Sequence, residues 1–138
     1  MKKERILFVC TGNSVRSQMA EAILQDLAGS KYEVMSAGVH PAPVHELTKE
    51  TLRNNEIDYD NFTTNHVNEF RHESLDYVIV LCEVANHYLP EFSKKPKILK
   101  WFLDDPVSIV GPREKQQNGF QMAFNEIRNK IKDFFKNK

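Results

Sequence analysis

Hydrophobic positions along the chain fall into short strand-like segments separated by longer segments with helical periodicity. Four short segments are enriched in apolar, β-branched and aromatic residues, and they cover residues 5–9, 32–37, 77–81 and 97–101. The segments at 5–9 and 77–81 are continuous apolar runs, which is typical of strands that are buried on both faces of a parallel sheet. We therefore predict four strands at these positions.

Helical periodicity is clearest in residues 18–28 and 119–135. The first segment is followed by Gly29, a typical C-cap residue, and its apolar positions are Met19, Ala20, Ile23, Leu24 and Leu27. The second predicts one apolar face made of Phe120, Ala123, Phe124, Ile127, Ile131 and Phe134. Shorter helices are predicted at 45–54, 69–72 and 83–88, the last ended by Pro90, and residues 57–68 are predicted to be irregular.

The alternation of strands and helices predicts an α/β fold, with a doubly wound four-stranded parallel sheet flanked by helices. A chain of 138 residues with 41% hydrophobic content suits a single domain over residues 1–138. In such folds the ligand site lies outside the carboxyl ends of the strands. Because Cys10, Cys82 and Asp105 each follow a predicted strand, we expect these three residues to converge at that edge.

Composition limits which partners the protein can be expected to bind and in which cellular compartment it is expected. Lys+Arg and Asp+Glu both number 19, so the formal net charge is zero. The sequence contains no basic stripe of the kind that binds nucleic acid or a membrane. The N-terminal apolar run is too short for a signal peptide, which predicts a cytoplasmic protein. Two cysteines in that setting favour redox chemistry over a structural disulfide. The five histidines show no metal-ligand spacing, and only His40 is expected near the site.

The candidate chemistry is concentrated in residues 10–17, Cys-Thr-Gly-Asn-Ser-Val-Arg-Ser, between the first strand and the first helix. A loop at a helix N-terminus directs backbone N–H groups and a positive dipole at one point, which suits a tetrahedral oxyanion. The same surroundings stabilise a thiolate, so Cys10 is expected to be a nucleophile at neutral pH.

Three further residues of the loop have expected roles. The planar fork of Arg16 can hold two oxyanion oxygens, Ser17 can hydrogen-bond the thiolate, and Asn13 can brace the loop or adopt a left-handed backbone. The competing interpretation is a chance C-x5-R spacing with Cys10 as a small buried hydrophobe.

At these residues the sequence resembles the low-molecular-weight protein tyrosine phosphatase superfamily, and within it the arsenate reductases most closely. The resemblance covers nearly the whole chain and rests on residues 10–21, Ser36-Ala37-Gly38, Leu81-Cys82, and Trp101 with Asp104-Asp105-Pro106. It implies a four-stranded parallel sheet flanked by helices. It also implies that Cys10 attacks the substrate and that Asp105 protonates the leaving group. The implied oxyanion-binding residues are Thr11, Gly12, Asn13, Ser14, Val15, Arg16 and Ser17.

For a reductase, the resemblance implies that arsenate binds the loop and that Cys82 attacks the Cys10 adduct, releasing arsenite. Reductases that use thioredoxin carry a third cysteine before a proline, where this chain has Leu89 before Pro90. An external thiol is therefore expected to complete the cycle: thioredoxin acting directly, glutathione with glutaredoxin, or a low-molecular-weight thiol such as mycothiol or bacillithiol. No tightly bound cofactor is expected. Val15 stands where many members carry a cysteine that forms a protective disulfide.

Two alternatives remain open. The phosphatases of the superfamily flank their pocket with aromatic residues, often two tyrosines after the Asp-Pro pair, whereas Val107 and Ser108 follow Pro106 here. These walls favour a compact inorganic oxyanion, with hydrolysis of phosphomonoesters as the alternative activity. A protein that binds an oxyanion or senses redox state without turnover is the third possibility, but binding alone needs no proton donor such as Asp105.

The resemblance also implies a possible cation site, since some reductases of the superfamily hold a monovalent cation near the loop. Here the expected potassium ligands are Asn13, Glu21, Ser36 and Thr63. Asn65 stands where an acidic ligand is expected, so the site is predicted to be weak.

Overall fold

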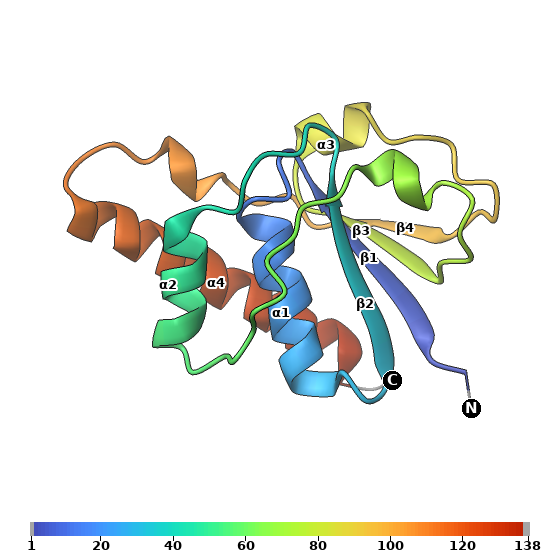
Figure 1. Ribbon diagram of the computed structural model, residues 1–138, viewed down its shortest axis with the longest axis horizontal. Coiled ribbons are helices and arrows are strands. Elements are labelled where there is room, and N and C mark those ends of the chain that lie inside the picture. Colours follow the sequence, from blue (N-terminus) through green and yellow to red (C-terminus); the bar gives the residue numbers. More distant parts are fainter. Residues whose placement is uncertain (1, 137–138) are drawn as a thin grey trace.

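The structure is a computed structural model that describes residues 2–136. Its four strands form one parallel sheet in the order β2-β1-β3-β4 (Figure 1), which confirms the predicted architecture. The strands are β1 (Glu4–Cys10), β2 (Tyr32–Gly38), β3 (Tyr77–Val80) and β4 (Lys97–Lys100). The apolar runs predicted as central strands are β1 and β3, which occupy the middle of the sheet, and the more polar β4 is an edge strand.

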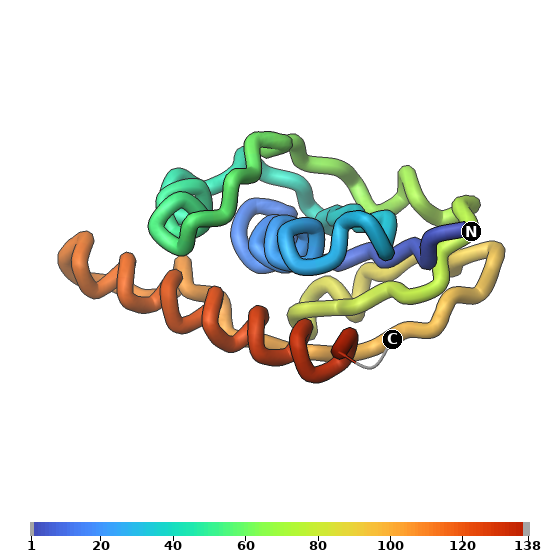
Figure 2. Tube along the Cα trace, turned by 90° about the horizontal axis from the view of Figure 1, so that it is seen from below, coloured from blue at the N-terminus to red at the C-terminus, as the bar shows by residue number. Residues whose placement is uncertain are grey.

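Helices connect these strands and cover the sheet. They are α1 (Arg16–Ala28), α2 (Glu46–Asn54), α3 (Glu83–His87) and α4 (Arg113–Phe135), with short 3-10 helices η1 (Val67–Phe70) and η2 (Pro106–Ser108). α1 packs against β1 and β2, and α4 packs along α1 and α2, as Figure 2 shows from below. Among the described residues, no helix is both long enough and apolar enough to span a bilayer.

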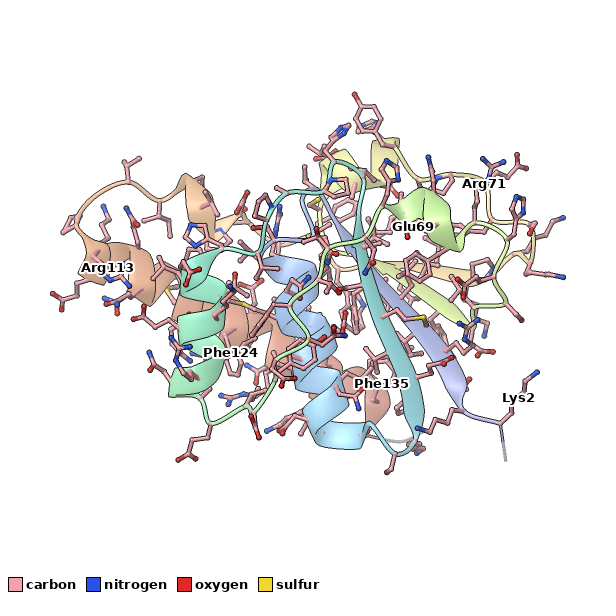
Figure 3. The ribbon with its side chains drawn as sticks, in the orientation of Figure 1. Lys2, Glu69, Arg71, Arg113, Phe124 and Phe135 are labelled. Carbon is pink, nitrogen blue, oxygen red and sulfur yellow. The ribbon has the colours of Figure 1, made fainter. Side chains whose placement is uncertain are left out.

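The core lies between the sheet and these helices. Residues 6–9 of β1 are fully buried, as the continuous apolar run predicts. The C-terminal end of α4 reaches the sheet through two rings: Phe134 contacts Tyr77 and Trp101, and Phe135 contacts Tyr32. Figure 3 shows Phe124 and Phe135 inside the molecule.

The structure corrects several predicted boundaries and faces. α1 begins at Arg16 and not at residue 18, α4 begins at Arg113 and not at residue 119, and the predicted helix at 69–72 is η1 at 67–70. Leu27 is not buried but 47% exposed, because it lines an open depression of about 350 Å³ between the ends of α1 and α4. In α4 the more deeply buried ring of the last turn is Phe135, while Phe134 is half-buried.

The candidate site residues were expected at the edge of the sheet formed by the carboxyl ends of the strands. In Figure 1 the loop after β1 lies beside α3, which follows β3. Cys10 ends β1 and Cys82 immediately precedes α3, and both thiols are buried and free. The expected convergence at this edge is therefore present.

Candidate active site

The loop of residues 10–17 is held from outside by the segment that follows β2. The carbonyl oxygens of Cys10, Thr11 and Gly12 accept hydrogen bonds from N–H groups of residues 39, 40 and 42, at 3.2, 2.8 and 2.9 Å. Because a trans peptide is planar, the N–H of the next residue points opposite to each carbonyl. The N–H groups of residues 11–13 therefore point away from that segment, as a loop that holds an anion requires.

Cys10 is braced by two buried polar side chains. Its Sγ lies 2.9 Å from Ser17 Oγ, which in turn accepts a hydrogen bond from Asn13 Nδ2 at 2.8 Å. Because Asn13 donates a hydrogen bond to Ser17 Oγ, the hydroxyl hydrogen of Ser17 is free to point at Cys10. Asn13 also adopts a left-handed backbone, with φ of 54°. Both expectations for Asn13 and the expected contact of Ser17 are confirmed.

Gly38 allows β2 to pass directly under this loop. A Cβ atom at Gly38 would lie 2.8 Å from backbone atoms of Thr11, Gly12 and Asn13. Contacts that short do not occur at real side chains, so only glycine fits here without moving the loop. Steric crowding by the loop therefore explains why a glycine ends the segment Ser36-Ala37-Gly38.

Arg16 is buried and held from one side. Its Nη1 donates to the carbonyl oxygen of Leu103 at 3.0 Å, and its Nη2 lies 3.6 Å from Asp105 Oδ2. Within residues 2–136, no acceptor lies within hydrogen-bond distance of its buried Nε. An unpaired buried donor on a cation is costly, and an oxyanion in the loop would supply the missing acceptor.

Asp105 stands at the opening of the loop. Its Oδ1 accepts from the N–H of Val107 at 3.0 Å, which caps η2, and its other oxygen faces Arg16. A cavity of about 240 Å³ lies between these groups and is lined by Cys10, Thr11, Gly12, Ser14, Val15, Arg16, His40, Ala42, Asp105 and Val107. Of the predicted oxyanion-binding residues, Asn13 and Ser17 do not line it, because they brace the loop from behind.

Cys82 borders a second, adjoining cavity. Its Sγ lies 3.1 Å from Thr11 Oγ1, which connects it to the residue next to Cys10. The second cavity has a volume of about 530 Å³ and is lined by Thr11, Arg16, Cys82, Glu83, Val84, Phe102, Leu103, Asp104 and Asp105. Thr11, Arg16 and Asp105 border both cavities, so the space beside each thiol shares part of its wall with the space beside the other.

The roles of some site residues could not be predicted from the sequence. The carbonyl of Leu103 orients Arg16, but any residue could provide that oxygen. Tyr88 packs edge-on against His40 with ring centroids 5.1 Å apart, so the predicted pocket residue His40 has an aromatic neighbour from the end of α3. Only the structure brings these pairs together.

Three of the four expected potassium ligands, Asn13, Ser36 and Glu21, are joined by hydrogen bonds, and Thr63 is linked to Asn13 through the side chain of Gln18. Asn13 Nδ2 donates to Ser36 Oγ at 2.9 Å, and Ser36 Oγ donates to Glu21 Oε1 at 2.5 Å. The second oxygen of Glu21 accepts from the hydroxyl of Tyr59, and the carbonyl of Thr63 accepts from a side-chain amide. Burial raises the pKa of Glu21 to about 7, against the opposing effect of the Ser36 hydrogen bond. With hydrogen-bond donors already on both oxygens of its only carboxyl group, this arrangement does not fit a cation.

Known proteins resemble this chain over nearly its whole length. Residues 5–137 match the family described as low molecular weight phosphotyrosine protein phosphatase. The chain belongs to this family. Within it, arsenate reductase 2 of Staphylococcus saprophyticus is 34% identical over 137 residues, which cover 99% of this chain and 100% of that protein.

Solved structures of the family have the same fold. An arsenate reductase in a phosphate-binding state superposes with a TM-score of 0.81 at 25% identity, covering 97% of this chain and 98% of the other. A thioredoxin-dependent arsenate reductase from Corynebacterium glutamicum has a TM-score of 0.76 at 28% identity, covering 98% of this chain and 61% of that one.

Proposed function

We propose that this protein reduces arsenate to arsenite, with Cys10 as nucleophile, Cys82 as second thiol and an external thiol as electron source. The observation that carries the proposal is the contact between Thr11 and Cys82, which holds a second thiol beside the Cys10 loop. Hydrolysis of a phosphate ester needs only one cysteine, whereas reduction by two electrons needs two thiols. Full-length relatives named arsenate reductase support this choice.

Arsenate would bind in the cavity of about 240 Å³, between the N–H groups of the loop and Arg16. The orphaned Nε of Arg16 would donate to one oxygen, and Nη2 would donate to a second. Leu103 already fixes the guanidinium, so little of it must be reordered when the oxyanion arrives. Such preorganised donors stabilise developing charge by about 3–4 kcal/mol each.

The first step joins Cys10 to arsenic. The thiolate attacks arsenic in line, an S–As bond forms, and the opposite As–O bond breaks. Asp105 would give its proton to the departing oxygen, so water leaves. Its position in the lining of the oxyanion cavity, at the opening, supports this role.

The second step transfers the electrons. Cys82 as a thiolate attacks the Cys10 sulfur, an S–S bond forms, and the electron pair of the S–As bond stays on arsenic. Arsenic falls from the +5 to the +3 state and leaves as arsenite. Cys10 ends β1, and Cys82 lies two residues after the neighbouring strand β3, whose Val80 pairs with Val9. Paired strands lie about 4.8 Å apart, and disulfides span Cα separations of about 4.4–6.8 Å. The fold therefore supports formation of a Cys10–Cys82 disulfide.

An external thiol, from a protein or a small molecule, would then return both cysteines to the reduced form. We place this cycle in the cytoplasm, where thiols are kept reduced. The proposal includes no potassium ion, because the cluster around Glu21 does not fit one.

Hydrolysis of phosphomonoesters is the second candidate activity. It is favoured by the same arrangement of Cys10, Arg16 and Asp105, since a phosphocysteine formed there could be hydrolysed without Cys82. The small cavity would admit small aryl phosphates.

The test is an assay of arsenate-dependent reductant consumption beside an assay with para-nitrophenyl phosphate. The purified protein is offered thioredoxin, glutathione with glutaredoxin, and low-molecular-weight thiols in parallel. Turnover with any of these reductants supports the reductase. Hydrolysis of the aryl phosphate with no reductant consumed would make the protein a phosphatase.

A further inference from the structure

The disulfide left by the proposed reaction must be reduced from outside the chain. The full sequence contains only two cysteines, Cys10 and Cys82, so no third thiol can carry the disulfide to the surface. The reductant must therefore reach one of these two sulfurs directly. The two cavities differ in which sulfur they expose.

Both sulfurs are buried, but Cys82 is the one beside the larger cavity. It borders the larger cavity of about 530 Å³, whereas Cys10 borders only the oxyanion cavity. Cys10 is also the better leaving group, because Ser17 and the loop N–H groups stabilise its thiolate and a stabilised thiolate leaves faster. Attack from the larger cavity would thus fall on Cys82 and release Cys10.

The acidic lining of this cavity favours some thiol reductants over others. Glu83, Asp104 and Asp105 line it, and among residues 2–136 the only cation in its lining is the buried Arg16, which already faces Asp105. Thiolates with extra carboxylates, such as glutathione, are repelled by such a lining. Small anionic thiols are therefore poor reductants for this site.

Two apolar side chains at the same cavity are exposed to solvent. Val84 on α3 is 47% exposed and Phe102 after β4 is 43% exposed, although both are large hydrophobic residues. Both line the cavity that Cys82 borders. A protein surface with an apolar rim around its own thiol would cover them, bury apolar area and exclude water from the exchanging sulfurs.

We propose that a protein dithiol docks over Val84 and Phe102 and reduces the Cys10–Cys82 disulfide by attack on Cys82. This rests on the proposed function, since arsenate reduction generates the disulfide. The partner thiolate forms an S–S bond with Cys82, and the electron pair of the old bond leaves on Cys10. The second partner thiol loses its proton to solvent and attacks the partner's own sulfur, and Cys82 leaves as a thiolate that takes up a proton. One disulfide becomes two thiols, and the partner dithiol becomes a disulfide.

The first experiment locates the attack. The wild-type protein is oxidised with diamide, without arsenate, and a mass loss of two hydrogens confirms the disulfide. It is then mixed with a bacterial thioredoxin whose resolving cysteine is serine, and the mixed disulfide is mapped by peptide mass spectrometry. The proposal predicts a link to Cys82, and a link to Cys10 would overturn it. If diamide forms no disulfide, the proposed function and this proposal fail together, whereas a wrong link overturns this proposal alone.

The second experiment tests the docking surface. Val84→Ser and Phe102→Ser should each lower the rate constant for reduction by wild-type thioredoxin by about tenfold. Reduction by dithiothreitol should change less than twofold. Leu27→Ser is the matched control, because Leu27 is also 47% exposed but lies on the last turn of α1. Equal rates in all three variants would overturn the docking surface.

The third experiment tests the charge selection with three small thiols, compared per thiolate: cysteamine, 2-mercaptoethanol and 3-mercaptopropionate. The cationic thiol should reduce the disulfide about tenfold faster than the anionic one, and added salt or Glu83→Gln should narrow the difference. Glu46→Gln on α2 is the control, since this exposed carboxylate lines neither cavity. An anionic thiol as fast as the cationic one, or glutathione faster than thioredoxin, would contradict the proposal.

Discussion

Thr11 and Cys82 are 71 positions apart in the sequence, yet the hydroxyl oxygen of one lies 3.1 Å from the sulfur of the other. The contact joins the loop after β1 to the start of α3. It places a second thiol beside a loop that already holds Cys10. Two thiols therefore belong to one site, and this feature favours a reductase over a phosphatase.

Replacing Cys82 should separate the two activities. Cys82→Ser should lower arsenate reduction by a factor of at least about 10³ while para-nitrophenyl phosphate hydrolysis stays within about threefold, because only the electron transfer needs this sulfur. Cys10→Ser should abolish both activities. Steady-state assays of both variants check this, and equal loss of both activities in Cys82→Ser would make Cys82 structural.

Replacing Arg16 should weaken oxyanion binding and turnover together. Arg16→Lys keeps the charge but loses the planar fork and the orphaned Nε, so kcat/KM should fall by about 10²–10³. Inhibition by inorganic phosphate should weaken in parallel. Arg113→Lys, at an exposed position on α4, is the control and should leave both values unchanged. A fully active Arg16→Lys variant would contradict the assigned role.

Gly38→Ala should destabilise the fold, because its Cβ would lie 2.8 Å from three backbone groups of the loop. We expect a loss of at least about 2 kcal/mol in the free energy of unfolding. Gly12→Ala is the matched comparison, since its Cβ would meet its nearest neighbours at 3.6–3.8 Å, an ordinary contact. Urea unfolding of the two variants checks this, and equal losses would show that the close approach is not the cause.

The raised pKa of Glu21 makes stability depend on pH. The pKa is about 7 in the folded protein against an ordinary value of 4.5, so between these pH values the folded state holds a proton that the unfolded state has lost. This contribution to stability is fully present below about pH 4.5 and is lost as pH rises through about 7. Its size is at most about 3 kcal/mol, since one pKa unit corresponds to about 1.4 kcal/mol.

Glu21→Gln removes that titration. The free energy of unfolding of the variant relative to wild type should therefore rise between pH 5 and pH 8, which urea unfolding at several pH values measures. Glu46→Gln, an exposed carboxylate on α2, should show no such rise. A flat difference for Glu21→Gln would mean that the buried carboxyl is not protonated in this range.

The sequence predicted what is local. The strand, loop and helix of residues 5–28 form one contiguous motif, so Cys10, Arg16 and the bracing roles of Asn13 and Ser17 could be inferred without coordinates. The convergence of Cys82 and Asp105 was predictable because parallel strands end at one edge of the sheet. Hydrophobic periodicity was enough to locate the strands and helices, and the residue types in the loop indicated the chemistry.

Contacts between distant segments were not predictable. The Leu103 carbonyl lies 87 positions from Arg16 and Tyr59 lies 38 positions from Glu21, and each pair depends on how the loops pack. The start of α4 was missed because residues 113–118 are polar and carry no apolar period. Those turns are held instead through α2, where Glu50 pairs with Arg113 and Gln117.

A single-turnover experiment tests the central claim most directly. Fully reduced protein is mixed with excess arsenate and no external reductant, and arsenite and free thiols are counted together. The account predicts one arsenite per chain, loss of both thiols and a Cys10–Cys82 disulfide by peptide mapping. No arsenite, with both thiols still free, would contradict it.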